Sequence, residues 1–129
     1  MSNRLTTRYT DSLVEAYGPS GQKGTDGELF LLKVFSKWGW ESKWYEHDKK
    51  KQDAGIDIEF RNPKWKNFYS CDVKNNMKDN GTFYVYEDWL FKVKCDRIFH
   101  VNPNTGELVW YPVQEMKLAY KRGEERMTI

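Results

Sequence analysis

The sequence predicts a single α/β domain in which helices flank a mixed central β-sheet. The chain has 129 residues, the usual size of one domain with one hydrophobic core. Aromatic residues make up 16% of it, enough to build such a core although the mean hydropathy is only −0.87. Segments with strand-like alternation are interspersed with segments of helical periodicity, a pattern typical of α/β proteins.

The N-terminal part of the chain differs in composition from the rest. Residues 1–24 contain few aliphatic side chains and end in the run Gly-Pro-Ser-Gly-Gln-Lys-Gly. We expect a flexible arm here, with one short helix from Asp11 to Tyr17. The folded domain is expected to span residues 25–122, and residues 123–129 to form a C-terminal tail.

The first helix of the domain is expected to begin at Thr25, because Thr25 and Glu28 fit the capping box S/T-x-x-E. Apolar residues then recur at helical spacing, and Gly39 is placed to end the helix. The apolar positions are Leu29, Leu31, Leu32, Phe35 and Trp38.

Three strand-like segments follow this helix, at residues 43–47, 55–61 and 68–74. In the second and third, apolar residues alternate with polar ones, so each strand offers one face to a core and one polar face. The short loop between them predicts an antiparallel hairpin. The rest of the chain is expected to form a strand (82–86), a helical turn or two (87–94), two strands (96–101 and 108–111) and a closing helix (113–121).

Composition excludes some classes of protein and leaves others open. The 21 basic and 19 acidic residues give a net charge of +2, less than a strongly basic nucleic-acid-binding domain carries. A metal-binding carboxylate cluster would mask basic residues in this sum. The absence of a long apolar run argues against a membrane span or signal peptide and favours the cytoplasm. In such a reducing compartment, Cys71 and Cys95 are expected to be free buried thiols.

Charged residues interrupt the two central strands at corresponding places. The hairpin makes these strands neighbours, so the side chains of Asp57, Asp72 and Lys74 are expected to converge on one side of the sheet. Paired carboxylates repel each other unless a cation lies between them, and Mg²⁺ prefers such oxygen ligands. A nearby lysine can stabilise charge on a phosphate. The alternative is an exposed sheet face that carries cross-strand ion pairs.

The order of these elements resembles the PD-(D/E)XK nuclease superfamily, whose restriction-endonuclease-like core has the order αβββαβ. In that family, an acidic residue lies on the first helix, an Asp at the start of the second strand, and (D/E)-x-K on the third. Glu28, Asp57 and Asp72-Val73-Lys74 fall at these places. The residue before Asp57 is Ile56 instead of Pro, and the third-strand acid is Asp instead of the commoner Glu. The run from Asp53 to Asp57 is similar to the D-x-G-x-D run of resolvase-like and repair-nuclease branches.

The resemblance implies a role for each of these residues. Asp57 bridges one or more metal ions, Asp72 is a ligand, and the carbonyl group of Val73 is a further one. Lys74 positions the attacking water or stabilises the charge that develops on the phosphate. Glu28 holds a metal-bound water or the metal itself, although a capping-box glutamate would look the same in the sequence. The implied cofactor is Mg²⁺, for which Mn²⁺ can substitute.

Further residues are candidates for contacts with DNA, the expected partner. Basic residues interleaved with an aromatic suit a nucleic-acid groove, and charge runs are otherwise typical of solvated loops. The candidates are Lys49, Lys50, Lys51, Lys64, Trp65, Lys66 and Asn75. Surplus exposed tryptophans would suit a homodimer face.

Two functions follow from the sequence. The first is a Mg²⁺-dependent nuclease that hydrolyses phosphodiester bonds of DNA, an endonuclease acting on branched or otherwise structured DNA. The alternative is a non-catalytic nucleic-acid-binding or interaction protein on the same fold.

Overall fold

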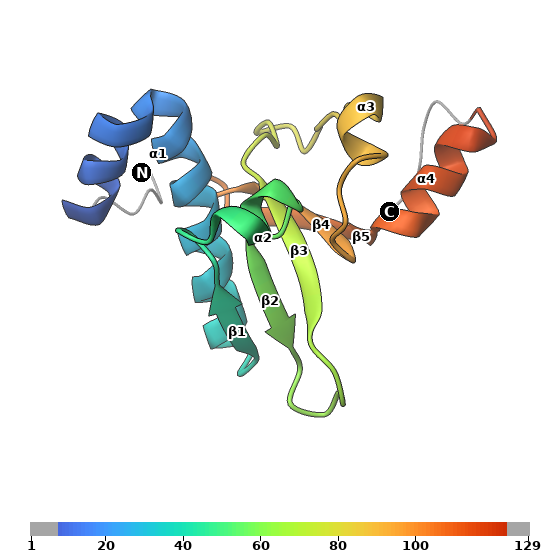
Figure 1. Ribbon diagram of the computed structural model, residues 1–129, viewed down its shortest axis with the longest axis horizontal. Helices are drawn as coiled ribbons and strands as arrows, with labels where there is room; N and C mark the ends of the chain where they lie inside the picture. The colour runs from blue at the N-terminus through green and yellow to red at the C-terminus, as the bar shows by residue number, and fades with distance from the viewer. Residues whose placement is uncertain (1–7, 124–129) are drawn as a thin grey trace.

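The computed structural model (Figure 1) describes the backbone of residues 8–123 and the side chains of residues 22–123. Its elements are, in chain order, α1 (Arg8–Lys37), β1 (Glu41–Trp44), α2 (Lys49–Asp53), β2 (Ile58–Arg61), β3 (Tyr69–Lys74), α3 (Glu87–Leu90), β4 (Arg97–Asn102), β5 (Glu107–Pro112) and α4 (Val113–Lys121). Residues 1–7 of the expected arm and 124–129 of the expected tail lie outside the described residues.

The strands form one mixed sheet in the order β1-β2-β3-β4-β5. Neighbouring strands are antiparallel except β3 and β4, which run parallel. Parallel neighbours require a crossover connection, and residues 75–96, which include α3, provide it. The predicted α/β class with a mixed central sheet and flanking helices is confirmed.

Helix α1 covers one face of the sheet. Its residues Leu31 and Phe35 are fully buried, and the Phe35 ring stacks on Phe60 of β2 at a centroid distance of 5.0 Å. Phe35 also meets Phe99 of β4 edge to face at 5.5 Å. A second buried cluster joins α3 and α4 to Ile98 of β4 and to β5. The sheet is therefore covered on both faces, with the second cluster placed toward its β4–β5 side.

Helix α1 begins far upstream of Thr25, so the expected loop at residues 18–24 and the expected capping box are both wrong. Thr25 lies inside the helix and is 7% exposed. Gly27 faces the end of β3, where a Cβ atom added to it would lie 2.9 Å from Cβ of Asn75. The glycine therefore permits close packing of helix on sheet, which the sequence alone does not distinguish from a helix break.

One helix was not expected, and one expected strand is wrong. Residues 49–53, a charged run after the expected strand at residues 43–47, form α2, and Asp48 caps it by accepting a hydrogen bond from the Lys51 backbone N–H at 3.0 Å. Residues 82–86, expected to be a strand, belong to none. Side chains meet their backbone instead: the amide of Asn76 donates to the Tyr84 carbonyl group at 3.2 Å, and the hydroxyl of Tyr120 to that of Val85 at 2.7 Å. No helix within residues 8–123 is both long enough and apolar enough to cross a membrane.

Candidate active site

The antiparallel pairing of β2 with β3 brings the two strand aspartates together. Ile58 pairs with Cys71, and the same register continued by one residue pairs Asp57 with Asp72. The Asp57 backbone N–H donates to the carbonyl group of Cys71 at 2.9 Å. In return, carboxylate oxygen Oδ2 of Asp57 accepts a hydrogen bond from the Val73 backbone N–H at 2.8 Å. These hydrogen bonds hold Asp57, the residue just before β2, opposite Asp72 in β3.

A tight turn after α2 directs the chain toward Asp57. Gly55 has φ of +74°, and a Cβ atom added to it would lie 2.9 Å from Cγ1 of Val93 in the crossover. The next residue, Ile56, donates its backbone N–H to the Lys51 carbonyl group at 2.9 Å. Both the conformation and the close approach require glycine here, so the Gly of the Asp-Ala-Gly-Ile-Asp run has a structural purpose.

Asp72 is a buried carboxyl group on the sheet face opposite α1, and only 5% of its surface is exposed. Its Oδ2 lies 3.2 Å from Nζ of Lys74, but no described donor reaches this oxygen in hydrogen-bond geometry. Burial raises the pKa of Asp72 well above its ordinary value, the adjacent Asp57 carboxyl raises it further, and Lys74 lowers it in part. In the absence of a cation, the buried position and the neighbouring Asp57 therefore favour the protonated form of Asp72.

The Lys74 side chain is held between an acid and an aromatic ring. Its Nζ lies 4.3 Å from the centroid of the Trp89 ring, in addition to its ion pair with Asp72. About a third of the side chain (36%) is exposed. The ammonium group is thus oriented by a cation–π contact and an ion pair and still reaches solvent.

Glu28 joins the site from α1. Its Oε1 accepts a hydrogen bond from the indole Nε1–H of Trp44 at 3.0 Å. Burial raises the pKa of Glu28 to about 7, the charge on Asp57 raises it as well, and the hydrogen bond from Trp44 lowers it. Glu28 therefore lies within electrostatic range of Asp57, the acid that is paired with Asp72 across the two strands.

His100 lies beside Lys74 in the parallel pairing of β3 with β4, and it is 1% exposed. Its Nδ1 lies 2.7 Å from Oδ1 of Asn76, and its Nε2 lies 2.7 Å from the hydroxyl of Tyr111. Burial, with a smaller effect of the Lys74 charge, lowers the pKa of His100 to about 3. The ring is therefore neutral, with Nδ1–H donating to Asn76 and Nε2 accepting from Tyr111.

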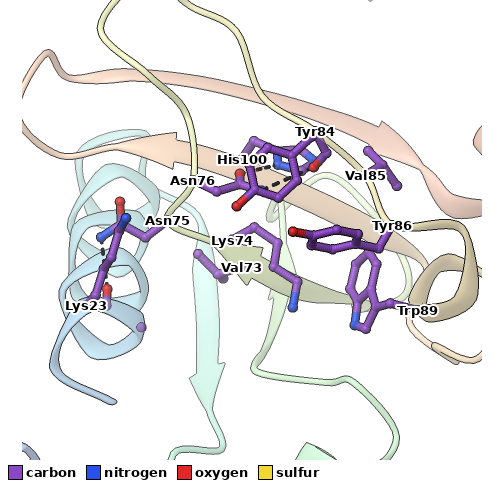
Figure 2. Close-up of a pocket in the computed structure, with 11 residues that line it drawn as sticks. Lys23, Val73, Lys74, Asn75, Asn76, Tyr84, Val85, Tyr86, Trp89 and His100 are labelled. Atoms are coloured by element: carbon purple, nitrogen blue, oxygen red, sulfur yellow. Dashed lines mark hydrogen bonds between the residues drawn. The ribbon is translucent and has the colours of Figure 1, made fainter. Parts of the chain in front are cut away.

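A cavity of about 430 Å³ opens beside Lys74, as Figure 2 shows. Its walls include Tyr84 and Tyr86 from the crossover, which are 51% and 67% exposed, and Trp89 of α3. No motif in the sequence assigns a function to these three aromatic residues. The sequence feature that could have pointed to them is the alternation in residues 82–86, because the tyrosines occupy its exposed positions.

The basic candidates divide into two groups. Lys49 and Lys50 are exposed on α2, at the end of β2 where Asp57 lies. Lys51 is engaged locally: its Nζ lies 3.9 Å from Oε2 of Glu59 and 4.9 Å from the centroid of the Tyr45 ring.

The other group lies on the hairpin between β2 and β3, at the opposite end of these strands from the aspartates (Figure 1). Lys64 and Lys66 are exposed there, but Trp65 packs into the protein, with its ring 5.0 Å from Trp40 and 5.5 Å from Tyr69. The structure therefore brings the α2 lysines to the carboxylates and keeps the hairpin residues away from them.

Asn75 follows Lys74 at the edge of the cavity. Its side-chain amide donates to the backbone carbonyl group of Lys23 in α1 at 2.9 Å. The residue therefore ties the end of β3 to the helix that carries Glu28.

The two cysteines are free and buried, as expected. Within residues 22–123, no three His, Cys, Asp or Glu side chains form a group arranged to hold a metal ion. The ligands that the described side chains offer at this site are thus the adjacent pair Asp57 and Asp72, and Glu28 does not complete a group of three with them. No protein-family model, curated protein or solved structure matches the chain.

Proposed function

We propose that the protein is a metal-dependent nuclease that hydrolyses phosphodiester bonds of DNA, with its active site at Asp57, Asp72 and Lys74. The observation that carries this proposal is the pair of adjoining carboxyl groups of Asp57 and Asp72, the second of them buried, with only the Lys74 ammonium group described near its Oδ2. Such a pair costs stability unless a cation lies against it. The order of α1, β1, β2, β3, α3 and β4 supports the resemblance to the restriction-endonuclease-like core, with α2 added before β2.

The donor set fits Mg²⁺ or Mn²⁺ better than zinc. Mg²⁺ binds through one or two carboxylates and completes its coordination with waters and substrate phosphate oxygens. Asp57 and Asp72 supply the two carboxylates, and the exposed end of Lys74 indicates that solvent reaches the site. A metal ion bound here would polarise a phosphoryl oxygen and lower the pKa of a bound water.

The side chains of the protein perform the remaining tasks. The hydrogen bond from the Val73 N–H orients the Asp57 carboxylate before any substrate arrives. Lys74, oriented by Trp89 and Asp72, presents an ammonium group to the negative charge that develops on the phosphate. Glu28, whose pKa of about 7 allows it to gain or lose a proton near neutrality, can accept a proton from the attacking water through Oε2 or a second water.

The direct test is cleavage of a panel of labelled DNAs with Mg²⁺, Mn²⁺ or EDTA. The panel contains supercoiled plasmid, linear duplex, single strand, flap and four-way junction. We expect metal-dependent cleavage that is lost in Asp72→Asn and in Lys74→Ala and retained in the matched controls Glu115→Gln and Lys117→Ala on α4. The flap or junction is expected to be the preferred substrate.

The alternative, a non-catalytic nucleic-acid-binding protein, gives a different result in the same panel. It predicts no cleavage of any DNA by the wild type with either metal, and equal DNA binding by the wild type and Asp72→Asn. Cleavage that survives both active-site substitutions would place the catalytic site elsewhere.

A further inference from the structure

The cavity beside Lys74 has the size and composition of a binding site for one nucleotide. Its volume of about 430 Å³ lies within the usual range for small-ligand pockets. None of the described residues that line it is acidic, whereas Lys23 and Lys74 both contribute to the lining. His100 on its inner wall is neutral, since burial lowers its pKa to about 3. The cavity is therefore lined by basic side chains and no described acidic one, although Lys74 also pairs with Asp72.

The outer wall of the cavity presents aromatic rings to solvent. Tyr84 and Tyr86 meet edge to face, with centroids 5.1 Å apart and ring planes at 70°. Tyr86 is the more exposed of the two at 67%. Monomeric proteins expose adjoining aromatic rings mainly where these bind something. Figure 2 shows Tyr86 and Trp89 side by side next to the Lys74 side chain.

The segment that carries the tyrosines is tied to the rest of the fold, although it is not part of the sheet. The side-chain amide of Asn76 donates to the Tyr84 carbonyl group, and the Tyr120 hydroxyl donates to that of Val85. Phe83, immediately before Tyr84, stacks on the buried His100 ring at a centroid distance of 4.0 Å. These contacts hold the exposed tyrosines in place before a ligand binds, which lowers the entropy cost of binding a planar ligand.

From these observations we infer that the cavity binds an unpaired base of the nucleic-acid substrate, stacked on Tyr86, whose ring Tyr84 contacts edge to face, with its phosphate directed toward Lys74. Aromatic rings next to basic side chains are the usual means of binding single strands, since every base has a face that stacks and every phosphate a charge. A base within a duplex is already stacked on its neighbours and does not offer its face. A nucleic acid with unpaired bases is thus the substrate class of the proposed nuclease. Only the placement of the phosphate at Lys74 rests on that proposed function.

Binding of a labelled oligothymidylate and of a blunt duplex of equal length, both in EDTA, tests the inference without requiring cleavage. The wild type is expected to bind the single strand more tightly. The double variant Tyr84→Leu/Tyr86→Leu is expected to lose about tenfold or more in affinity for the single strand and little for the duplex. The exposed aromatics Trp38 and Phe91 do not line the cavity, so Trp38→Leu and Phe91→Leu are matched controls.

A second measurement reports stacking itself. An oligonucleotide that carries 2-aminopurine loses fluorescence when this base stacks, so we expect quenching by the wild type and much less by the tyrosine variant. Absence of quenching by a wild type that binds the strand, or equal affinity of wild type and tyrosine variant, would overturn the inference. If tyrosine-dependent stacking is found but no DNA is cut, the base site stands and the proposed hydrolysis fails. If DNA is cut but the tyrosines have no effect, only the base site fails.

Discussion

The Asp57 carboxylate accepts a hydrogen bond from the backbone N–H of Val73 at 2.8 Å, so the acid that precedes β2 is tied to the strand that carries Asp72. A backbone donor keeps its position when side chains around it change. The bond therefore orients the Asp57 carboxylate toward its neighbour independently of any ligand. The first two predictions concern the cost of holding acidic groups in this site.

Asp72→Asn is expected to raise the stability of the metal-free protein. The amide has nearly the shape of the carboxyl group but carries no charge, so it removes both the burial cost and the repulsion from Asp57. Lys74 keeps its contact with Trp89 and its access to solvent. We expect the free energy of unfolding at pH 8, measured by urea titration in EDTA, to rise by about 1–2 kcal/mol. A loss of stability would mean that Asp72 is an ordinary structural ion-pair partner. Glu115→Gln on α4 is the control.

Glu28 is expected to make the metal-free protein less stable as the pH rises. Burial raises the pKa of Glu28 from its ordinary value of 4.5 to about 7 in the folded protein, so folding favours the protonated form. The resulting stabilisation is complete below pH 4.5 and is lost as the pH rises through 7. The pKa of Asp72 is raised as well, so Asp72 adds to the loss of stability as the pH rises.

Glu28→Gln isolates the contribution of that side chain. We expect the difference in unfolding free energy between wild type and Glu28→Gln to change by about 2 kcal/mol between pH 5 and pH 8. Urea titrations at a series of pH values in EDTA measure it. Parallel pH profiles for the two proteins would contradict the prediction. Added Mg²⁺ is expected to restore part of the stability of the wild type at pH 8.

Gly27→Ala is expected to disturb the site from within α1. The new methyl group would lie 2.9 Å from Cβ of Asn75 and 3.3 Å from Cγ2 of Val101, so the helix has to move away from β3 and take Glu28 with it. We expect a loss of about 1–3 kcal/mol in thermal or urea unfolding and a fall in cleavage rate. Gly24→Ala in the same helix meets nothing within 4 Å. It should be neutral or stabilising by up to about 1 kcal/mol, because alanine favours helix.

Tyr111→Phe tests the buried hydrogen bonds of His100. The substitution removes the hydroxyl that lies 2.7 Å from Nε2 and leaves this nitrogen buried without its partner. We expect the free energy of unfolding to fall by about 1–2 kcal/mol. Tyr84→Phe, at a half-exposed ring, is expected to have little effect. An equally stable Tyr111→Phe protein would show that water replaces the hydroxyl.

The two groups of lysines are expected to differ in their contribution to DNA binding. Lys49 and Lys50 lie at the carboxylate end of the hairpin, and Lys64 and Lys66 at the other end. The salt dependence of affinity falls by about 0.9 per lost phosphate contact. We expect Lys49→Gln/Lys50→Gln to reduce the slope of log Kd against log salt by about one to two, and Lys64→Gln/Lys66→Gln to leave it unchanged. The reverse result would show that DNA follows the hairpin instead of α2.

The antiparallel β2–β3 hairpin could be predicted from the sequence because local patterns encode it, whereas the strand expected at residues 82–86 does not form. Alternation in residues 55–61 and 68–74, with a short polar loop between them, determined both the pairing of β2 with β3 and the meeting of Asp57 with Asp72. Helix α4, Val113–Lys121, was predicted with its observed bounds. The parallel contact between β3 and β4 and the cavity beside it depend on contacts between distant residues, which no local pattern encodes.

Glycine residues gave a wrong prediction of a loop in one part of the chain and a correct indication of a turn in another. In the run that ends at Gly24, glycines and a proline predicted a loop, but α1 passes through them because its later turns pack on the sheet. In the run that ends at Asp57, the resemblance drew attention to Gly55, and the structure shows a left-handed turn there. Whether a glycine breaks a helix or allows close packing depends on the atoms around its Cα atom, and these are known only from the fold.

The carboxyl groups and the exposed tyrosines lie on separate parts of the fold. The strands and α1 hold the carboxyl groups, whereas the tyrosines that flank them belong to a connection that pairs with no strand. Tyr84 and Tyr86 can therefore be exchanged without altering the register of the sheet, whereas Phe83 and Val85 pack against buried residues. A library randomised at positions 84 and 86 alone would search for new substrate preferences while the carboxyl groups stay in place.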